Sequence, residues 1–134
     1  MKPQTIPQLI KRLDAVFSKY IRLRVADENG IVRCFTCGTP HHWTKAECGH
    51  YCKRQYMNTR FDEMNCQVQD FKCNYLEQGA DVKFKEALIK KYGEQEYNKL
   101  IARKYQTKKW SHFELQYLIE DYKKKVNELL KVTV

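Results

Sequence analysis

Two cysteines separated by two residues, Cys34 and Cys37, precede a glycine in the segment CFTCG, and Asp70 and Cys73 repeat the same spacing later in the chain. The two-residue gap lets both side chains of a pair reach one tetrahedral ion, and Gly38 permits the tight turn around it. Zinc accepts carboxylate oxygen as well as thiolate, so these two pairs predict a structural zinc site. A chain built around such a site folds with local turns and a bound ion in place of part of a large core.

The ligand set of this predicted site is open at one position. Asp70 stands where a fourth cysteine would be expected, and Cys48, Cys52 and Cys66 are thiols that could take its place. A carboxylate in place of a thiolate should make the site weaker and more sensitive to pH. The opposing hypothesis is that all six cysteines are small, buried apolar residues and that the chain binds no metal.

The charge balance indicates a partner with many negative charges. Twenty-five Lys and Arg against sixteen Asp and Glu give a formal net charge of +9, which attracts phosphates, so nucleic acid is the predicted partner. The alternative is that the excess lysines only keep the protein soluble. No stretch is long and apolar enough to span a bilayer, and the first residues lack the apolar stretch of a secretory signal. A cytoplasmic location is therefore expected, where cysteines stay reduced and serve as metal ligands.

A helix is expected before the cysteine-rich segment. Thr5 and Gln8 form a capping-box pattern, and apolar residues then follow a helical stripe to Ile21. Residues 22–26 and 31–33 flank the turn-forming segment DENG and predict a β-hairpin that leads directly into the first cysteine pair.

The C-terminal part of the chain is also expected to be helical. A helix at 82–92 should end before Gly93, a second is expected at 94–105, and Ser111 begins another capping-box pattern whose apolar stripe continues to the end. The length suits a single α+β domain. Its predicted parts are an N-terminal helix at 5–21, a small ββα-metal core with the zinc knuckle at 22–80, and a helical extension at 81–134, all within 1–134.

A histidine and two asparagines follow one another in a meaningful order. His50 lies between the two halves of the metal pattern, Asn65 precedes the second half, and Asn74 directly follows Cys73. This order beside paired metal ligands is the pattern of the HNH, or ββα-metal, nucleases, in which a hairpin and a helix hold one divalent ion over a phosphodiester.

Each of these side chains suits one task in phosphodiester hydrolysis. A neutral imidazole whose pKa lies near the operating pH can deprotonate a water molecule, which makes His50 the predicted general base. The carboxamide of Asn65 can orient the other imidazole nitrogen and fix the hairpin loop by hydrogen bonding. Asn74 offers a hard oxygen ligand that suits magnesium or manganese, and the cation would neutralise charge on the phosphate.

The chain closely resembles the phage recombination endonucleases of the NinG (Rap) family. The resemblance rests on the segments FSKYIRLR, CFTCG, CGHYCKR, RFDEMN and CN and on a helix led by Trp110, and it covers roughly residues 9–130. It implies a phage-encoded, structure-selective DNA endonuclease that acts in the bacterial host cytoplasm on branched intermediates such as Holliday junctions and D-loops. It further implies His50 as general base, Asn65 as positioning residue, Asn74 as metal ligand, and Arg54 and Arg60 on phosphates.

Two positions depart from the family pattern. Gly49 stands where many HNH nucleases have an acidic or histidine metal ligand, so the catalytic ion needs another protein oxygen. Glu47 is the preferred candidate, with Asp62 and Glu63 as alternatives. The second departure is Asp70, where the family normally has a cysteine, and it affects the predicted zinc site rather than the cleavage chemistry.

Basic and aromatic residues near the predicted base are candidate substrate contacts. Lys53, Arg54 and Arg60 flank it at short range, and arginine can bind a phosphate through two parallel N–H bonds. Aromatic side chains could stack on unpaired bases or simply pack in the core. These aromatic candidates are Tyr51, Tyr56 and Trp110.

Two classes of function and two roles for the last helix are compatible with the sequence. The chain is predicted to be a metal-dependent DNA endonuclease, and the alternative is a non-catalytic zinc-knuckle module that only binds nucleic acid. A homodimer would place two active sites on a junction with local two-fold symmetry. The apolar stripe of the last helix is the candidate dimer interface, or it packs on the first helix of the same chain.

Overall fold

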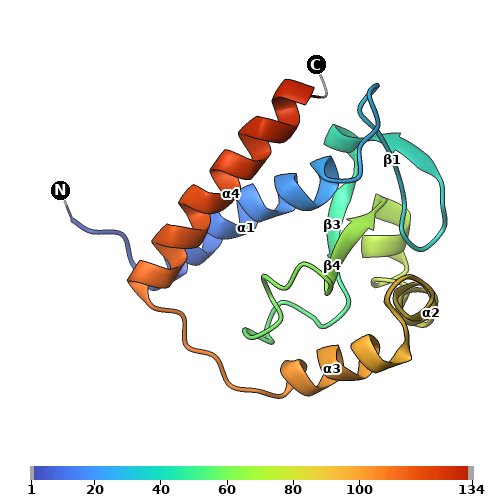
Figure 1. Cartoon of the computed structure of the whole chain (residues 1–134). Helices are drawn as coiled ribbons and strands as arrows, with labels where there is room; N and C mark the ends of the chain where they lie inside the picture. Colours follow the sequence, from blue (N-terminus) through green and yellow to red (C-terminus); the bar gives the residue numbers. More distant parts are fainter. Residues whose placement is uncertain (1, 133–134) are drawn as a thin grey trace.

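The computed structural model describes residues 2–132 as a mixed α+β fold in which helices surround two small β-hairpins (Figure 1). This confirms the predicted fold class. The elements in chain order are α1 (Ile6–Leu23), β1 (Ile31–Arg33), β2 (Pro40–His42), a 3₁₀ turn (Trp43–Lys45), β3 (Glu47–His50), β4 (Cys66–Gln69), the π-helical turn η2 (Lys72–Leu76), α2 (Asp81–Tyr92), α3 (Glu94–Lys104) and α4 (His112–Val132).

Helix α1 begins as the sequence pattern predicts. The Thr5 side chain accepts a hydrogen bond from the Gln8 N–H, and the Gln8 side chain accepts one from the Thr5 N–H, which completes the capping box. The apolar stripe of α1 packs against the main core and forms one side of it. Its buried members are Leu9, Leu13, Phe17, Ile21 and Leu23.

Helix α4 covers α1 and runs in the same direction (Figure 1). The two starts lie together, because His112 Nε2 is 3.1 Å from the Gln4 carbonyl oxygen, and further along the Tyr20 and Tyr122 rings are 5.1 Å apart. Ser111 caps α4 through reciprocal 3.1 Å bonds with Glu114. The apolar stripe of α4 packs into this core within the chain, as one of the two expectations for this helix had it.

The first hairpin differs from the prediction. Residues 22–23 continue α1, with Leu23 buried, and β1 pairs instead with β2, placing Val32 opposite His41. The CFTCG segment is therefore the loop of this hairpin, and Gly38 has the positive φ of +77° that the tight turn requires. The sequence pattern misplaced the hairpin because the knuckle, not the DENG turn, reverses the chain between the paired strands.

The second hairpin pairs β3 with β4 and places His50 opposite Cys66. It lies between the α1–α4 pair and the α2–α3 pair (Figure 1). Helices α2 and α3 form a smaller core together with the start of the segment that joins β3 to β4. The buried side chains of that core are Cys52, Phe84, Leu88, Tyr97 and Leu100. No helix within residues 2–132 combines the length and the apolar character needed to cross a membrane.

Gly49 is required by close packing rather than by its backbone angles. A Cβ atom at this position would lie 1.9 Å from Oε1 of Gln69. Gln69 is fully buried, and its Nε2 donates to Thr36 Oγ1 at 3.1 Å and to the Gly79 carbonyl at 3.0 Å. This carboxamide ties the first hairpin to the segment after η2, which explains the glycine where an acidic or histidine ligand was expected.

Substituting Gly49→Ala should lower the free energy of unfolding by about 1–3 kcal/mol, because the added methyl group displaces Gln69 from two buried hydrogen bonds. Urea denaturation of both proteins measures the loss. In a Gln69→Ala background the same substitution should cost far less, because the clash is gone. An equal cost in both backgrounds would contradict this account of Gly49.

Candidate functional site

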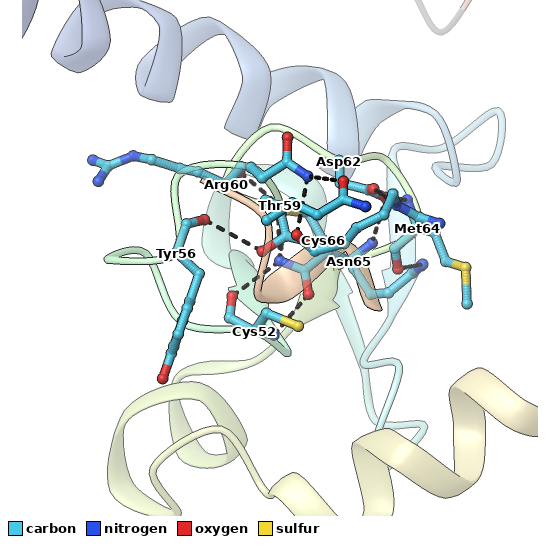
Figure 2. Close-up of polar contacts among 12 residues, drawn as sticks. Cys52, Tyr56, Thr59, Arg60, Asp62, Met64, Asn65 and Cys66 are labelled. Atoms are coloured by element: carbon cyan, nitrogen blue, oxygen red, sulfur yellow. Dashed lines mark hydrogen bonds and ion pairs between the residues drawn. The ribbon is translucent and has the colours of Figure 1, made fainter. Parts of the chain in front are cut away.

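Asn65 holds the long connection between β3 and β4 in one conformation (Figure 2). Its Oδ1 accepts from the Cys52 N–H at 2.7 Å, and its Nδ2 donates to the carbonyl oxygens of Cys52 and Thr59, each at 3.0 Å. The side chain is fully buried, so these bonds are protected from water. Asn65 therefore fixes the loop that follows His50.

The imidazole of His50 is oriented by the Arg60 carbonyl and not by Asn65. His50 Nε2 lies 3.0 Å from that oxygen, and since a carbonyl can only accept, Nε2 carries the proton and Nδ1 holds the free electron pair. Burial lowers the pKa of His50 to about 4, because the charged imidazolium is poorly solvated there. The ring is therefore neutral at pH 7, with one unprotonated nitrogen, and its pKa lies below the range near the operating pH that was expected of the base.

Glu47 and Asn74 meet at the edge of the second hairpin. Asn74 Nδ2 donates to Glu47 Oε1 at 2.8 Å, so a carboxylate and a carboxamide from β3 and η2 lie side by side. Both residues line the same cavity as His50, which has a volume of about 720 Å³. The Glu47 carboxylate and the Asn74 amide oxygen are hard donors of the type that magnesium and manganese prefer.

Asp62 and Glu63, the alternative oxygen donors, are engaged elsewhere. Asp62 accepts a 2.8 Å bond from Arg103 Nε, and Glu63 accepts one of 2.7 Å from the Tyr122 hydroxyl. Neither residue lines the cavity that contains His50. Glu47 is therefore the best placed of the three candidates.

The three predicted phosphate contacts differ in accessibility. Lys53 and Arg54 line the cavity, and Lys53 also binds Asp81 at 2.9 Å. Arg54 and Arg60 both bind the Asp14 carboxylate of α1, but the Arg54 side chain is 62% exposed and that of Arg60 only 14%. Arg60 thus anchors the loop to α1, and Arg54 is the better candidate for contact with a phosphate.

The predicted zinc ligands lie together on the first hairpin and at the start of η2. The ligand atoms of Cys34, Cys37, Asp70 and Cys73 are all within 4.8 Å of one another. Asp70 Oδ2 accepts from the Cys37 thiol at 3.1 Å, and its Oδ1 accepts from the Cys73 N–H at 2.9 Å. Three sulfurs and one carboxylate oxygen at this spacing fit a tetrahedral zinc ion.

His41 supports this cluster, although no spacing pattern in the sequence includes it. Its Nε2 lies 3.3 Å from Asp70 Oδ2, a contact of the kind that orients metal-binding carboxylates. Burial acts to raise the pKa of Asp70, but hydrogen bonds from Cys73, Cys37 and His41 outweigh it and lower the pKa to about 2. The carboxylate is therefore charged at pH 7. Only the pairing of β1 with β2 shows that His41 belongs beside the cluster.

A second group of metal-binding side chains lies on one face of the other hairpin. The ligand atoms of Cys48, His50 and Cys66 are also within 4.8 Å of one another. Two sulfurs and a nitrogen suit zinc better than magnesium. Burial and the neighbouring Cys48 thiol raise the pKa of Cys66 far above its usual value, and Cys66 lies 3.5 Å from the Arg60 carbonyl as a thiol donor. Both groups thus have the composition of a zinc site.

The family model of the bacteriophage lambda NinG protein matches residues 2–132. The chain belongs to the NinG family. Neither the comparison with curated proteins nor that with solved structures found a match.

In this NinG family chain, α1 contributes a wall of the cavity that the sequence motifs did not reveal. The α1 residues that face the cavity recur at helical spacing on the side away from the buried stripe. This periodicity is the sequence feature from which their place in the site could have been predicted. Arg22 also lies over the Trp43 ring, with 5.3 Å between its Cζ and the ring centroid. The α1 residues that line the cavity are Lys11, Asp14, Ala15, Ser18 and Arg22.

Each aromatic residue named as a base-stacking candidate contacts another part of the chain and is partly buried. The Tyr51 hydroxyl lies 2.6 Å from that of Tyr97, and Trp110 Nε1 donates to the Met57 carbonyl at 3.1 Å. Tyr56 lies beside the Tyr105 ring, with 6.3 Å between centroids.

Proposed function

We propose that this NinG family protein is a metal-dependent DNA endonuclease of the HNH type that hydrolyses phosphodiesters in branched recombination intermediates. The observation that carries the proposal is the shared cavity, where the neutral His50 imidazole and the Glu47–Asn74 pair lie among basic side chains. The branched substrate, such as a Holliday junction or D-loop, comes from the family resemblance. The bacterial host cytoplasm is the corresponding location.

His50 acts as the general base in this proposal. Its Nδ1 accepts a proton from the attacking water, while Nε2 stays bound to the Arg60 carbonyl. Because Asn65 fixes the loop that carries this carbonyl, the ring keeps its orientation as it becomes charged. Asn65 is therefore a positioning residue that acts through Arg60.

Glu47 and Asn74 provide the oxygen ligands for the catalytic cation. Magnesium or manganese held there would neutralise charge on the scissile phosphate and the leaving oxygen. Their mutual 2.8 Å hydrogen bond keeps the two side chains at one edge of the cavity.

Lys53 and Arg54 bind the phosphates of the substrate backbone. Without substrate, Arg54 forms an ion pair with Asp14, which also binds Arg60. A phosphate can replace Asp14 as the partner of Arg54, because the Asp14 carboxylate then still has Arg60 as its partner. Arg60 keeps the loop in place during this exchange.

His50 serves as a base rather than as a zinc ligand. A zinc ion on Cys48, His50 and Cys66 would occupy the imidazole that the reaction needs. The first cluster, from Cys34 to Cys73, is the structural zinc site in this proposal.

A cleavage assay tests enzyme, cofactor and substrate class together. Linear duplex, flap and four-way junction DNA should be compared with magnesium, with manganese and with EDTA. Junction or flap DNA should be cut only with a metal ion, and at least about tenfold faster than linear duplex. Binding without cleavage of any substrate would favour the alternative of a non-catalytic zinc-knuckle module.

Mass measurement of the complex would test whether a homodimer binds the junction, using a surface other than the buried stripe of α4.

A further inference from the structure

A stacked aromatic pair, Phe71 and Tyr75, is exposed at the η2 turn. Phe71 and Tyr75 are 51% and 69% exposed, and their rings stack at 5.1 Å between centroids with 16° between planes. Leu76 and Val82 are exposed nearby in the chain. Contiguous large apolar side chains that stay exposed are a feature of binding sites.

The aromatic pair is tied directly to the proposed active site. Asn74 lies between its two members in the chain, lines the cavity and binds Glu47. Cys73, also between them, is buried and donates its N–H to Asp70 at 2.9 Å. The turn is thus anchored to β3 on one side and to the first cysteine cluster on the other, so the pair has a fixed position relative to the cavity.

We propose that Phe71 and Tyr75 form a stacking site for an unpaired nucleobase of the DNA strand whose phosphodiester enters the cavity. The proposal rests on the proposed function and names the feature of the substrate that the site recognises. Two parallel rings with most of their surface exposed match the flat face of a base, which stacks on aromatic side chains regardless of sequence.

The charges around the pair favour nucleic acid over a protein segment. Four cationic side chains line the neighbouring cavity against two acidic ones, Asp14 and Glu47, which leaves an excess of two positive charges for phosphates. Lys72, next to Phe71, has a side chain that is 70% exposed, although Glu77 lies 3.9 Å from it. The four cavity cations are Lys11, Arg22, Lys53 and Arg54.

Only an unpaired base can stack a whole face on these aromatic rings. In a continuous duplex both faces of every base are covered by its neighbours, whereas bases at flaps, gaps and strand exchanges can be displaced. The stacking site therefore gives a physical reason for preferring branched DNA over a continuous duplex.

The double substitution Phe71→Ala/Tyr75→Ala tests the proposal. Its dissociation constant for a flap with an unpaired base should rise about tenfold, the order of one lost base–aromatic stack, and change less than about twofold for linear duplex. Binding is measured with calcium in place of magnesium, so the readout does not require cleavage. A 2-aminopurine placed at the unpaired position should be quenched by the unchanged protein and not by the variant.

The matched control is Phe113→Ala/Tyr117→Ala, an equally spaced and exposed aromatic pair on α4. It should leave both affinities within about twofold, and Phe71→Tyr/Tyr75→Phe should retain flap binding. Thermal melting verifies that each variant is folded.

Equal loss of affinity for flap and duplex, unchanged flap affinity, or loss of a protein dimer with unchanged DNA binding would overturn the stacking site. Failure of the unchanged protein to cleave DNA would reject only the proposed endonuclease, since the fluorescence readout would stand.

Discussion

Replacing His50 with alanine should slow metal-dependent DNA cleavage by about 100- to 10 000-fold, the usual contribution of a general base. The variant lacks the nitrogen that accepts the proton from water, while the Glu47–Asn74 pair and the cavity cations remain. Its affinity for DNA should therefore stay within about threefold of the original value. Single-turnover cleavage and a binding titration on the same junction measure the two effects.

His42→Ala is the matched control for this substitution. His42 is an exposed histidine on β2 that contacts Thr44 at 2.8 Å and does not line the cavity, so its loss should leave cleavage unchanged. Because His50→Ala also leaves the Arg60 carbonyl without its partner, thermal melting must accompany the assay. Cleavage at the full rate by His50→Ala would reject the assignment, and parallel loss of cleavage and DNA binding would point to a folding role.

The sequence best predicted the features that depend on residues close together in the chain. Capping boxes at Thr5 and Ser111 start helices in the structure because the bonds that define them join residues three apart. The cysteine spacing brought Cys34 and Cys37 together for the same reason, since two intervening residues close a single turn. The same spacing placed Asp70 and Cys73 in the predicted site, and their ligand atoms lie with those of the first pair. The match over residues 2–132 establishes the family itself.

Longer-range pairings could not be predicted in this way. The partner of β1 depended on whether the DENG turn or the knuckle loop reversed the chain, and both contain turn-forming residues. The partner of His50 is a backbone carbonyl, which no side-chain pattern reveals. Likewise, Asp14 of α1 meets Arg54 and Arg60 only after the core has formed. Such contacts follow from packing rather than from spacing.

Replacing Cys73 with serine should release the structural zinc and lower the melting temperature by about 10 °C or more, because a structural zinc site contributes directly to the folding free energy. Cys73 is buried at the centre of the first cluster, where it joins η2 to the first hairpin. Elemental analysis of protein purified without chelator, together with thermal melting, measures both effects. The unchanged protein should contain one zinc ion per chain.

Asp70→Cys is the complementary variant and should slow the transfer of zinc to a chelator, because a fourth thiolate binds the ion more tightly than a carboxylate. This gain in zinc retention is reduced because the substitution also removes the contacts of Asp70 with His41 and with the Cys73 N–H. Cys48→Ser serves as the control, since Cys48 belongs to the second cluster and should leave the zinc content unchanged. A second zinc ion that disappears in Cys48→Ser would make His50 a zinc ligand and contradict its role as base, whereas protein without zinc would refute the structural site.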